Sequence, residues 1–408
     1  MTDPIKPRDA SEVEDAVQAA LANGQTLEIV GHGSKRAIGR AAQWDRTLDL
    51  TGLSGVTLYE PAELVLSAKA GTPLADVEAL VAANNQQLAF EPMDYGPVLG
   101  RPAGQGTIGG MLAANLAGPR RIKAGAARDH FLGFSAVSGR GETFKSGGRV
   151  VKNVTGYDLS KLMAGSWGTL AVMTDVTIKV LPRPETEETL IALDLDDATA
   201  VQTMSAAMSS AAEVSGAAHV PAGVSGRLPA PSFSGVKRSV TALRLEGVPP
   251  SIAHRRELLM GQFRSRELVT LAETDSVAFW RAIRDVTPFG ATIGSDRPLW
   301  RISTAPAKGA ALGATLVATC NADVIYDLAG GLVWEMLPPC DDAGAAAVRA
   351  VSAAQGGHAT LVRASASVRA SVDVFEPQDR VLAALSKRVK DAYDPKGILN
   401  PARMWAGV

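Results

Sequence analysis

The sequence has few cysteines and no long apolar run. Its 408 residues include two cysteines, Cys320 and Cys340, which cannot supply the four thiolates of an iron–sulfur cluster or of a cysteine-rich zinc site. We expect both to be small buried hydrophobic residues, and any iron–sulfur chemistry to need another chain. No apolar run approaches the roughly 18 residues that a membrane-spanning helix requires, so no transmembrane segment is predicted.

The sequence also lacks an excess of charge of either sign. It has 41 Lys and Arg against 42 Asp and Glu, a formal net charge of -1, so no field of the whole molecule attracts nucleic acid or an anionic membrane. Residues 1–10 are polar and have no apolar core like that of a secretory signal, which predicts a cytoplasmic protein. The length suits two or three lobes rather than one core.

Glycine and basic residues are concentrated in one part of the chain. Of the 40 glycines, 15 lie between Gly100 and Gly168, where backbone with positive φ or close approach to a ligand explains such density. A loop-rich surface is the alternative. Between Arg101 and Lys152 there are nine Lys or Arg against two acids, which predicts a positive face for an anionic ligand or an acidic partner.

The pattern of apolar residues predicts an α+β chain. Ser11 and Glu14 form a capping box for a helix over residues 12–22, and a strand over 26–30 follows it. Thr72 can cap a second helix that starts at Pro73. Strand-like runs cover 131–138, 142–145 and 169–181, and the proline pair near 184 predicts the end of the first domain.

The remaining sequence predicts a second domain and a returning tail. Residues 185–377 are alanine-rich and read as a smaller α+β cap domain. A helix is expected over 378–393, because Val381, Leu382, Leu385, Val389 and Ala392 recur at helical spacing. We expect residues 378–408 to pack back on the first domain, residues 1–184.

A glycine loop follows the first predicted strand. Successive backbone N–H groups in Gly31-His32-Gly33-Ser34-Lys35 can form a concave site for a pyrophosphate, although a tight structural turn would have the same sequence. The loop is not a Rossmann fingerprint, because no G-x-G-x-x-G opens a helix, and it is not a Walker loop.

A second glycine segment lies at the start of a predicted helix. Thr107 suits an N-cap, whereas Gly109 and Gly110 in the first turn each cost about 1 kcal/mol relative to alanine. Their small size lets a ligand approach that turn, where negative charge is favoured. Two such sites in one domain predict a dinucleotide whose phosphates are held between them.

A third segment completes the set of motifs. Residues 151–162 (VKNVTGYDLSKL) precede the run GSWGTL at 165–170. In this order, the glycine loop, the Thr-Ile-Gly-Gly segment and this signature resemble the vanillyl-alcohol-oxidase-type FAD-linked oxidoreductases. The similarity covers about the first 180 residues and the tail 394–404. Within the family, the chain most resembles the short FAD-binding subunits of glycolate oxidase complexes.

The resemblance implies a PCMH-type FAD domain of two α+β subdomains that hold FAD between them, under a cap domain. Gly31, His32, Gly33, Ser34 and Lys35 would wrap the pyrophosphate. The residues on the phosphate and ribityl side would be Thr107, Gly109, Gly110 and Asn115. Gly125, Arg128 and Asp129 would lie near the flavin, and the backbone of Val172 would contact the adenine or ring end.

Two departures from the family pattern affect the cofactor site. Lys35-Arg36 stands where relatives often have a further glycine and a hydroxyl residue, so charge replaces a hydroxyl contact. His32 and His130, the histidines of this domain, do not lie in a motif for covalent flavin attachment. We therefore expect non-covalent FAD.

Catalytic residues are harder to predict. Oxidation of a 2-hydroxy acid requires a cation for the carboxylate and a base for the hydroxyl proton. The His-x-His pair of metal-dependent relatives is absent, so no metal site is predicted. His358 with Arg363 is the preferred pair, and Arg301 and Trp334-Glu335 are weaker candidates. The alternative is that His358 is an ordinary strand histidine.

The resemblance implies an FAD-binding subunit of a complex that oxidises glycolate to glyoxylate and passes electrons through partner subunits. Because the His-x-His pair is absent, it stays open whether this chain itself oxidises the substrate. The expected partners are a paralogous FAD subunit and an iron–sulfur subunit, through which the chain could lie at the inner membrane. A stand-alone FAD-dependent oxidoreductase of a small alcohol or hydroxy acid is one alternative. A scaffold subunit without cofactor is the other.

Overall fold

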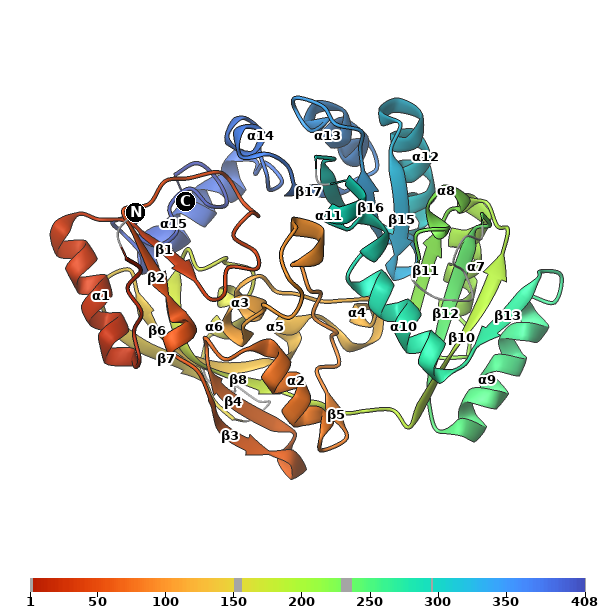
Figure 1. The fold of residues 1–408 in the computed structure, drawn as a ribbon, viewed down its shortest axis with the longest axis horizontal. Helices are drawn as coiled ribbons and strands as arrows, with labels where there is room; N and C mark the ends of the chain where they lie inside the picture. Colours follow the sequence, from red (N-terminus) through yellow and green to blue (C-terminus); the bar gives the residue numbers. More distant parts are fainter. Residues whose placement is uncertain (1–2, 150–155, 229–236, 295, 408) are drawn as a thin grey trace.

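The computed structural model describes residues 3–149, 156–228, 237–294 and 296–407. Figure 1 shows two lobes, with both ends of the chain in the first lobe and a single large sheet in the second. Helices and strands are interspersed in both lobes, as the predicted α+β class requires.

The first lobe contains three sheets, two of which lie on either side of the predicted glycine loop. β1 (Leu27–Val30) and β2 (Arg46–Asp49) form a parallel pair. An antiparallel five-stranded sheet has the order β3-β4-β8-β6-β7. Its strands are Val56–Glu60, Val65–Lys69, Ala171–Lys179, Phe131–Ser138 and Thr143–Gly147, in that order, and a short pair joins β5 (Gln86–Gln87) to β9 (Leu181–Pro182).

Helices cover both faces of the five-stranded sheet. α1 (Ala10–Asn23) packs Val13 and Val17 against Val137 and Val172 on one face. α3 (Ile108–Ala113) contacts β4 and β8 and belongs to the other core. The other helices of this lobe are α2 (Leu74–Ala82), α4 (Arg121–Ala124), α5 (Ala127–His130) and α6 (Leu159–Met163), with the 3-10 turns Leu50–Gly52, Pro61–Glu63 and Pro97–Leu99.

The predicted strands of this lobe are confirmed to within a few residues, whereas two predicted helix caps are wrong. Asp9, not Ser11, accepts the hydrogen bond from the Glu12 N–H that caps α1. The Thr72 hydroxyl donates to the carbonyl oxygen of Lys69 at 2.6 Å, and α2 begins without a side-chain cap. In both cases a neighbouring polar group competes for the hydrogen bond.

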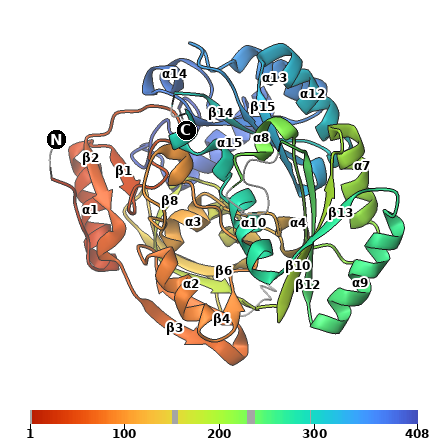
Figure 2. The same cartoon turned by 45° about the vertical axis from the view of Figure 1, so that its right-hand side comes forward.

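The second lobe is built on a sheet of eight strands in the order β13-β10-β12-β11-β15-β16-β14-β17. In that order the strands are Leu268–Leu271, Thr186–Leu193, Val240–Gly247, Gly216–Val220, Asp323–Asp327, Leu332–Met336, Leu299–Ser303 and His358–Arg363. Figure 2 shows α7, α9, α12 and α13 on the outside of this sheet and α10 on the side of the first lobe. These helices are Asp197–Met208, Pro249–Gln262, Gly309–Cys320, Ala345–Ala354 and Glu273–Arg284. The shorter elements are α8 (Ala222–Ser225), α11 (Ala291–Gly294) and α14 (Ala366–Ser371), with the 3-10 turns Thr287–Phe289, Pro306–Lys308 and Leu328–Gly330.

The chain returns to the first lobe through α15 (Arg380–Tyr393) and the tail (Figure 1). The helix is confirmed, but three of the apolar residues at helical spacing face solvent: Val381 is 80% exposed, and Leu382 and Leu385 are also exposed. Lys390 is buried instead, where it donates to Asp394 at 2.7 Å and to the carbonyl oxygen of Thr169 at 2.6 Å. This buried ion pair, rather than a leucine stripe, fixes the helix.

The cysteine prediction is also wrong in part. Cys340 is exposed and Cys320 is partly exposed, and both thiols are free. Cys320 is the last residue of α12 and packs in part against the core, whereas Cys340 lies in the loop after β16.

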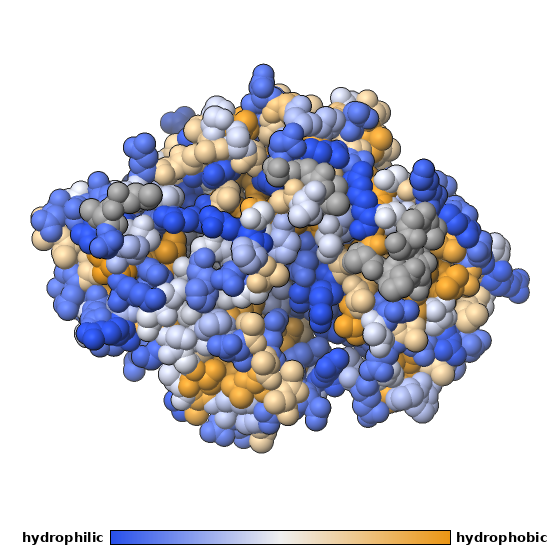
Figure 3. Space-filling model, in the orientation of Figure 1, coloured by the Kyte–Doolittle hydropathy of each residue, from blue (hydrophilic) through white to orange (hydrophobic). Residues whose placement is uncertain are grey.

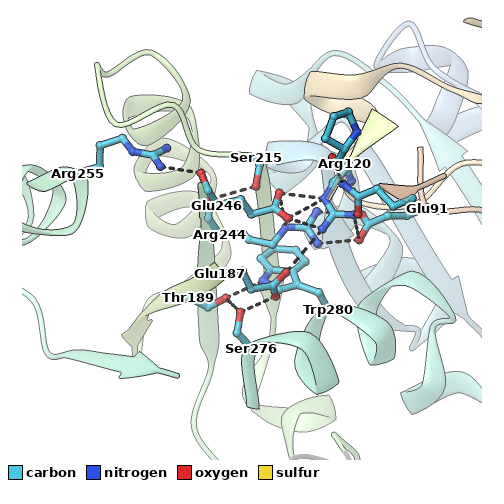
Figure 4. Close-up of polar contacts among 12 residues, drawn as sticks. Glu91, Arg120, Glu187, Thr189, Ser215, Arg244, Glu246, Arg255, Ser276 and Trp280 are labelled. Carbon is cyan, nitrogen blue, oxygen red and sulfur yellow. Dashed lines mark hydrogen bonds and ion pairs between the residues drawn. The ribbon is translucent and has the colours of Figure 1, made fainter. Parts of the chain in front are cut away.

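A buried cluster of charged residues joins the two lobes (Figure 4). Arg244 of β12 donates to both carboxylate oxygens of Glu91 at 2.8 and 2.9 Å. Arg120 donates through Nε to Glu246 at 2.8 Å and lies 3.6 Å from Glu187. In the same view of the molecule as Figure 1, hydrophilic side chains line the hollow between the lobes (Figure 3). The basic stretch predicted as one positive face is therefore partly neutralised, because Arg120 belongs to this cluster.

Candidate functional site

The two predicted glycine segments meet in one cleft. The loop of residues 31–36 leaves the end of β1, and residues 107–110 begin α3. Both line a cleft of about 730 Å³ between the parallel strand pair and the five-stranded sheet. A Cβ atom on Gly31 would lie 2.6 Å from Oγ1 of Thr107, so the loop and the helix start are in direct contact. The two glycine segments therefore converge in the structure, as the sequence predicted.

Individual glycines in the cleft have different physical roles. Gly33 has φ +73°, a left-handed conformation that other residues adopt at a cost. Gly109 lies against β4, because a Cβ there would be 2.8 Å from the Ala70 carbonyl oxygen. Gly110 faces the ammonium group of Lys35 and donates its N–H to Thr107, the predicted N-cap, at 3.2 Å.

The cleft contains a cation without a carboxylate partner. Burial lowers the pKa of Lys35 to about 8. Its Nζ lies 3.2 Å from the hydroxyl oxygen of Ser34, and no described carboxylate forms an ion pair with it. Arg36 next to it is paired with the buried Glu28. A buried ammonium group of this kind is stabilised by an anion.

Arg403 of the tail supplies a second cation to the same cleft. It donates to the carbonyl oxygen of Lys35 at 3.0 Å and lies over the ring of Trp167, with 5.5 Å between Cζ and the ring centroid. Its Nε has no hydrogen-bond partner among the described residues, and burial lowers its pKa to about 10. Lys35 and Arg403 thus fit a diphosphate, which offers several anionic oxygens to both.

The tail is bonded to β1 and to the Trp167 turn of the third motif. Asn400 accepts from the Ile29 N–H at 2.8 Å and donates to the carbonyl oxygen of Trp167 at 2.8 Å. The Leu27 N–H donates to the Ile398 carbonyl oxygen at 2.7 Å. Residues 398–403 therefore hold β1 against the Trp167-Gly168 turn, where both residues have positive φ.

The structure places some of the predicted cofactor residues at this cleft and others away from it. His32, Ser34, Thr107, Gly109 and Gly110 line it with Lys35. Asn115 accepts from the Arg128 N–H and lines a neighbouring cavity instead. Residues 125, 128 and 129 do not line either space, since the Asp129 carboxylate accepts from the Ala126 N–H and Arg128 is exposed.

Val172 and part of the third motif lie elsewhere. The side chain of Val172 is buried against α1, and its neighbours Ala171 and Met173 line the cleft in its place. Residues 151–155 of the predicted signature lie outside the described residues. The part that the structure describes includes Gly168, which also lines the cleft.

A second cavity of about 820 Å³ adjoins the cleft and reaches the sheet of the second lobe. The two spaces share Ala114 and Trp167 as lining residues. Polar and aromatic side chains from both lobes face the cavity. They are Tyr95, Asn115, Arg121 and Arg284 of the first lobe and α10, and Arg301, Asp327, Trp334 and Thr360 of the large sheet.

The charges in this cavity are unusual. Burial lowers the pKa of Arg121, and Arg301 lowers it further. Asp327 is 3% exposed, and burial raises its pKa to about 7. His358 lies within reach of the same arginines, since burial, Arg301 and Arg121 all lower its pKa. A carboxylate and two guanidinium groups therefore line the same cavity.

The predicted pair of His358 and Arg363 is not a site. The two residues lie at opposite ends of β17, where five residues of strand span roughly 16 Å. The Arg363 guanidinium donates to the carbonyl oxygens of Val98, Phe289 and Arg297 and so joins backbone segments. Its donors are used in the fold and cannot bind a substrate carboxylate.

Sequence reasoning missed Arg403, Asp327 and the role of Arg121. In the sequence, Arg121 is one of the nine basic residues between Arg101 and Lys152, and Asp327 ends a strand-like run shortly before Gly330-Gly331. Neither signal identifies a partner far away in the sequence. Of the weaker candidates, Arg301 and Trp334 line the cavity, whereas Glu335 is buried in the second lobe and has no hydrogen-bond partner among the described residues.

Comparisons with known proteins agree with this geometry. Residues 4–147 match a family model described as an FAD binding domain. The glycolate oxidase subunit GlcE of Escherichia coli is 34% identical over 395 residues, 96% of each chain. The glycolate oxidase subunit GlcD of Bacillus subtilis is 42% identical over 99 residues, which are 24% of this chain and 21% of that one.

A solved structure has the same fold at low identity. The crystal structure of p-cresol methylhydroxylase with substrate bound superposes with a TM-score of 0.71 at 12% identity, over 98% of this chain and 88% of that one. The expected FAD-binding α+β fold is thereby confirmed. Among the described residues no helix is long and apolar enough to cross a membrane, and no group of three or more His, Cys, Asp or Glu is placed to hold a metal.

Proposed function

Because the chain belongs to the family of FAD-linked oxidoreductases that includes the glycolate oxidase subunit GlcE, we propose that it is the FAD-binding subunit of a complex that oxidises glycolate to glyoxylate. The observation that carries the cofactor assignment is the cleft in which two glycine segments face two buried cations. The choice of glycolate rests on the name of that relative.

The residues of the cleft hold FAD without a covalent bond in this proposal. Lys35 and Arg403 neutralise the diphosphate, and the N–H groups of the 31–34 loop donate to it. His130 is buried, with its Nε2 2.8 Å from the Ala124 carbonyl oxygen. When bound, FAD supplies a two-electron acceptor. We assign this role to residues 1–184, with 185–377 as the cap and 378–408 as the returning segment.

The further electron carriers belong to other subunits in this proposal. The chain has two cysteines, which cannot ligate an iron–sulfur cluster alone. A paralogous FAD subunit related to GlcD and an iron–sulfur subunit are the proposed partners, in the cytoplasm or at the inner face of a membrane through those partners.

The test is co-purification followed by steady-state turnover. A tagged chain expressed with its untagged neighbours should retain them, and the complex should reduce a dye with glycolate. The isolated chain should carry FAD yet turn over slowly, because its electron exit is missing. Full turnover by the isolated chain would show a stand-alone oxidoreductase, and a folded, colourless chain would show a scaffold.

A further inference from the structure

The cavity beside the cleft contains two arginines that the fold leaves unpaired. Arg121 of α4 and Arg301 of β14 line it from opposite lobes. Neither side chain forms an ion pair or a hydrogen bond with another residue of the part that the structure describes. Arg284 at the same cavity differs, since Asp285 accepts two hydrogen bonds from it at 2.8 and 2.7 Å. Two free guanidinium groups facing one space favour a carboxylate ligand.

Asp327 is the acidic group of this cavity. It ends β15, and one of its oxygens accepts from the Leu328 N–H at 2.7 Å. No other described residue donates a hydrogen bond to this carboxylate or pairs with it, although it is 3% exposed. A buried carboxylate without a cation is costly, so this position is unexplained by stability alone.

The backbone after Asp327 is strained. Leu328, Ala329 and Gly330 have φ values of +52°, +58° and +96°, so two consecutive residues with side chains adopt the left-handed conformation. Strain of this kind costs about 1–3 kcal/mol per residue and persists where the surrounding structure enforces it, often at functional sites. The turn fixes the carboxylate of Asp327 at the cavity wall.

We propose that this cavity binds the 2-hydroxy acid, with its carboxylate between Arg121 and Arg301 and its hydroxyl group toward Asp327, which accepts the hydroxyl proton. The proposal rests on the proposed function, because it requires FAD in the adjoining cleft. It assigns substrate oxidation to this chain and leaves the onward passage of electrons to its partners.

The chemical step balances with FAD as the oxidant. The O–H bond breaks and its proton passes to the Asp327 carboxylate. The C–H bond on the same carbon breaks, and the hydrogen leaves with the electron pair to FAD while the carbon–oxygen bond becomes double. Arg121 and Arg301 hold the carboxylate and thereby orient that C–H bond toward the cleft.

The protonation state of Asp327 makes the proposal measurable by binding alone. Burial raises the pKa of Asp327 to about 7, Arg301 and Arg244 oppose this shift, and Glu91 adds to it. Oxalate resembles the substrate but has no C–H bond, so it cannot transfer a hydride to the flavin. Its dianion is repelled by ionised Asp327, so oxalate should bind more tightly below pH 7 than above it.

The experiment is a titration of the FAD-loaded chain with oxalate, followed by the flavin spectrum and by thermal stabilisation. Arg301→Met should weaken oxalate binding roughly 10- to 100-fold, whereas Arg264→Met, at an exposed arginine, should not change it. Asp327→Asn should retain oxalate binding, remove its dependence on pH near 7 and abolish single-turnover flavin reduction by glycolate. His358→Gln should preserve the pH dependence.

The outcomes separate the two proposals. Failure of the chain to bind FAD overturns the proposed function. A chain that binds FAD but shows the same oxalate affinity with Arg301→Met overturns the substrate site alone. Normal flavin reduction by Asp327→Asn overturns the role of Asp327. The thermal transition shows whether this variant is folded, and if it is not, Asp327→Ser takes its place in the same measurements.

Discussion

At the scale of single residues, Lys35 carries much of the cofactor assignment. Burial lowers its pKa to about 8, so the ammonium group is still charged at neutral pH. It forms no ion pair with a carboxylate of the described residues. A bound diphosphate favours the charged form and raises this pKa. FAD binding therefore takes up a proton above pH 8, and the affinity should fall as pH rises beyond that value.

Replacement of Lys35 tests this charge. Lys35→Met should weaken FAD binding by about 1.5–3 kcal/mol and remove the fall in affinity above pH 8. The measurement is FAD binding by fluorescence quenching between pH 6 and about 10, the range on either side of the Lys35 pKa. Lys237→Met, at an exposed lysine of the second lobe, is the matched control. An unchanged affinity in Lys35→Met would show that the diphosphate binds elsewhere.

Two glycines of the cleft should respond differently to valine. Gly33→Val strains a left-handed residue and closes the loop, yet a Cβ there meets nothing closer than 3.9 Å, so the variant should lose FAD with a modest change in melting temperature. Gly109→Val meets the backbone of Ala70 at 2.8 Å and should lower the melting temperature sharply. Equal melting temperatures in the two variants would contradict these roles.

The sequence identifies the glycine loops and Lys35 but not Arg403, the second cation of the cleft. Gly31, Gly33 and Thr107 are recognisable because their local geometry depends on neighbours in the sequence. Arg403 and Lys35 meet across 368 residues, and no local pattern encodes that contact. Arg128, which the family resemblance placed near the flavin, is exposed.

At the scale of elements, α15 and the tail position the cleft from outside the first 180 residues. The buried Lys390–Asp394 pair links the helix to Thr169 and Leu399. The tail in turn holds β1 against the Trp167 turn. Helical spacing predicted the helix correctly, but it does not reveal which face is covered: Leu382 and Leu385 are exposed.

A comparison of two lysines on α15 tests this anchor. Lys390→Met leaves the Asp394 carboxylate buried and unpaired, which should destabilise the protein by about 3–5 kcal/mol and weaken FAD binding. Lys387→Met removes the exposed pair with Asp391 and should cost less than about 1 kcal/mol. Urea unfolding measures the stability of both variants, and FAD titration measures their affinity for the cofactor. Equal FAD affinities in Lys390→Met and the wild-type chain would show that the tail does not shape the cleft.

At the scale of the whole molecule, the cluster of Glu91, Arg120, Arg244, Glu187 and Glu246 joins the two lobes (Figure 4). Burial alone would raise the pKa of Glu246, but Arg244 and Arg120 outweigh it and lower that pKa to about 2. This contribution to stability is present above about pH 4.5 and is lost as pH falls toward 2.

Removal of Arg244 tests the cluster. Arg244→Met leaves Glu91 and Glu246 buried without their main partner and should lower the free energy of unfolding by about 3–5 kcal/mol. The loss should shrink in acid, where the carboxylates become protonated. Urea unfolding at neutral pH and in acid measures both effects, and a loss that stays constant between them would contradict the account. The sequence could not predict this cluster, since its members come from strands and loops that meet only in the folded chain.

The most direct test of the account is the flavin content of the purified full-length chain. The structure predicts a yellow protein with the visible bands of oxidised flavin, and denaturation should release one FAD per chain into solution. Gly33→Val and the Lys35→Met variant should be partly or fully colourless while they remain folded. A folded wild-type chain that stays colourless after incubation with FAD would contradict the assignment of the cleft.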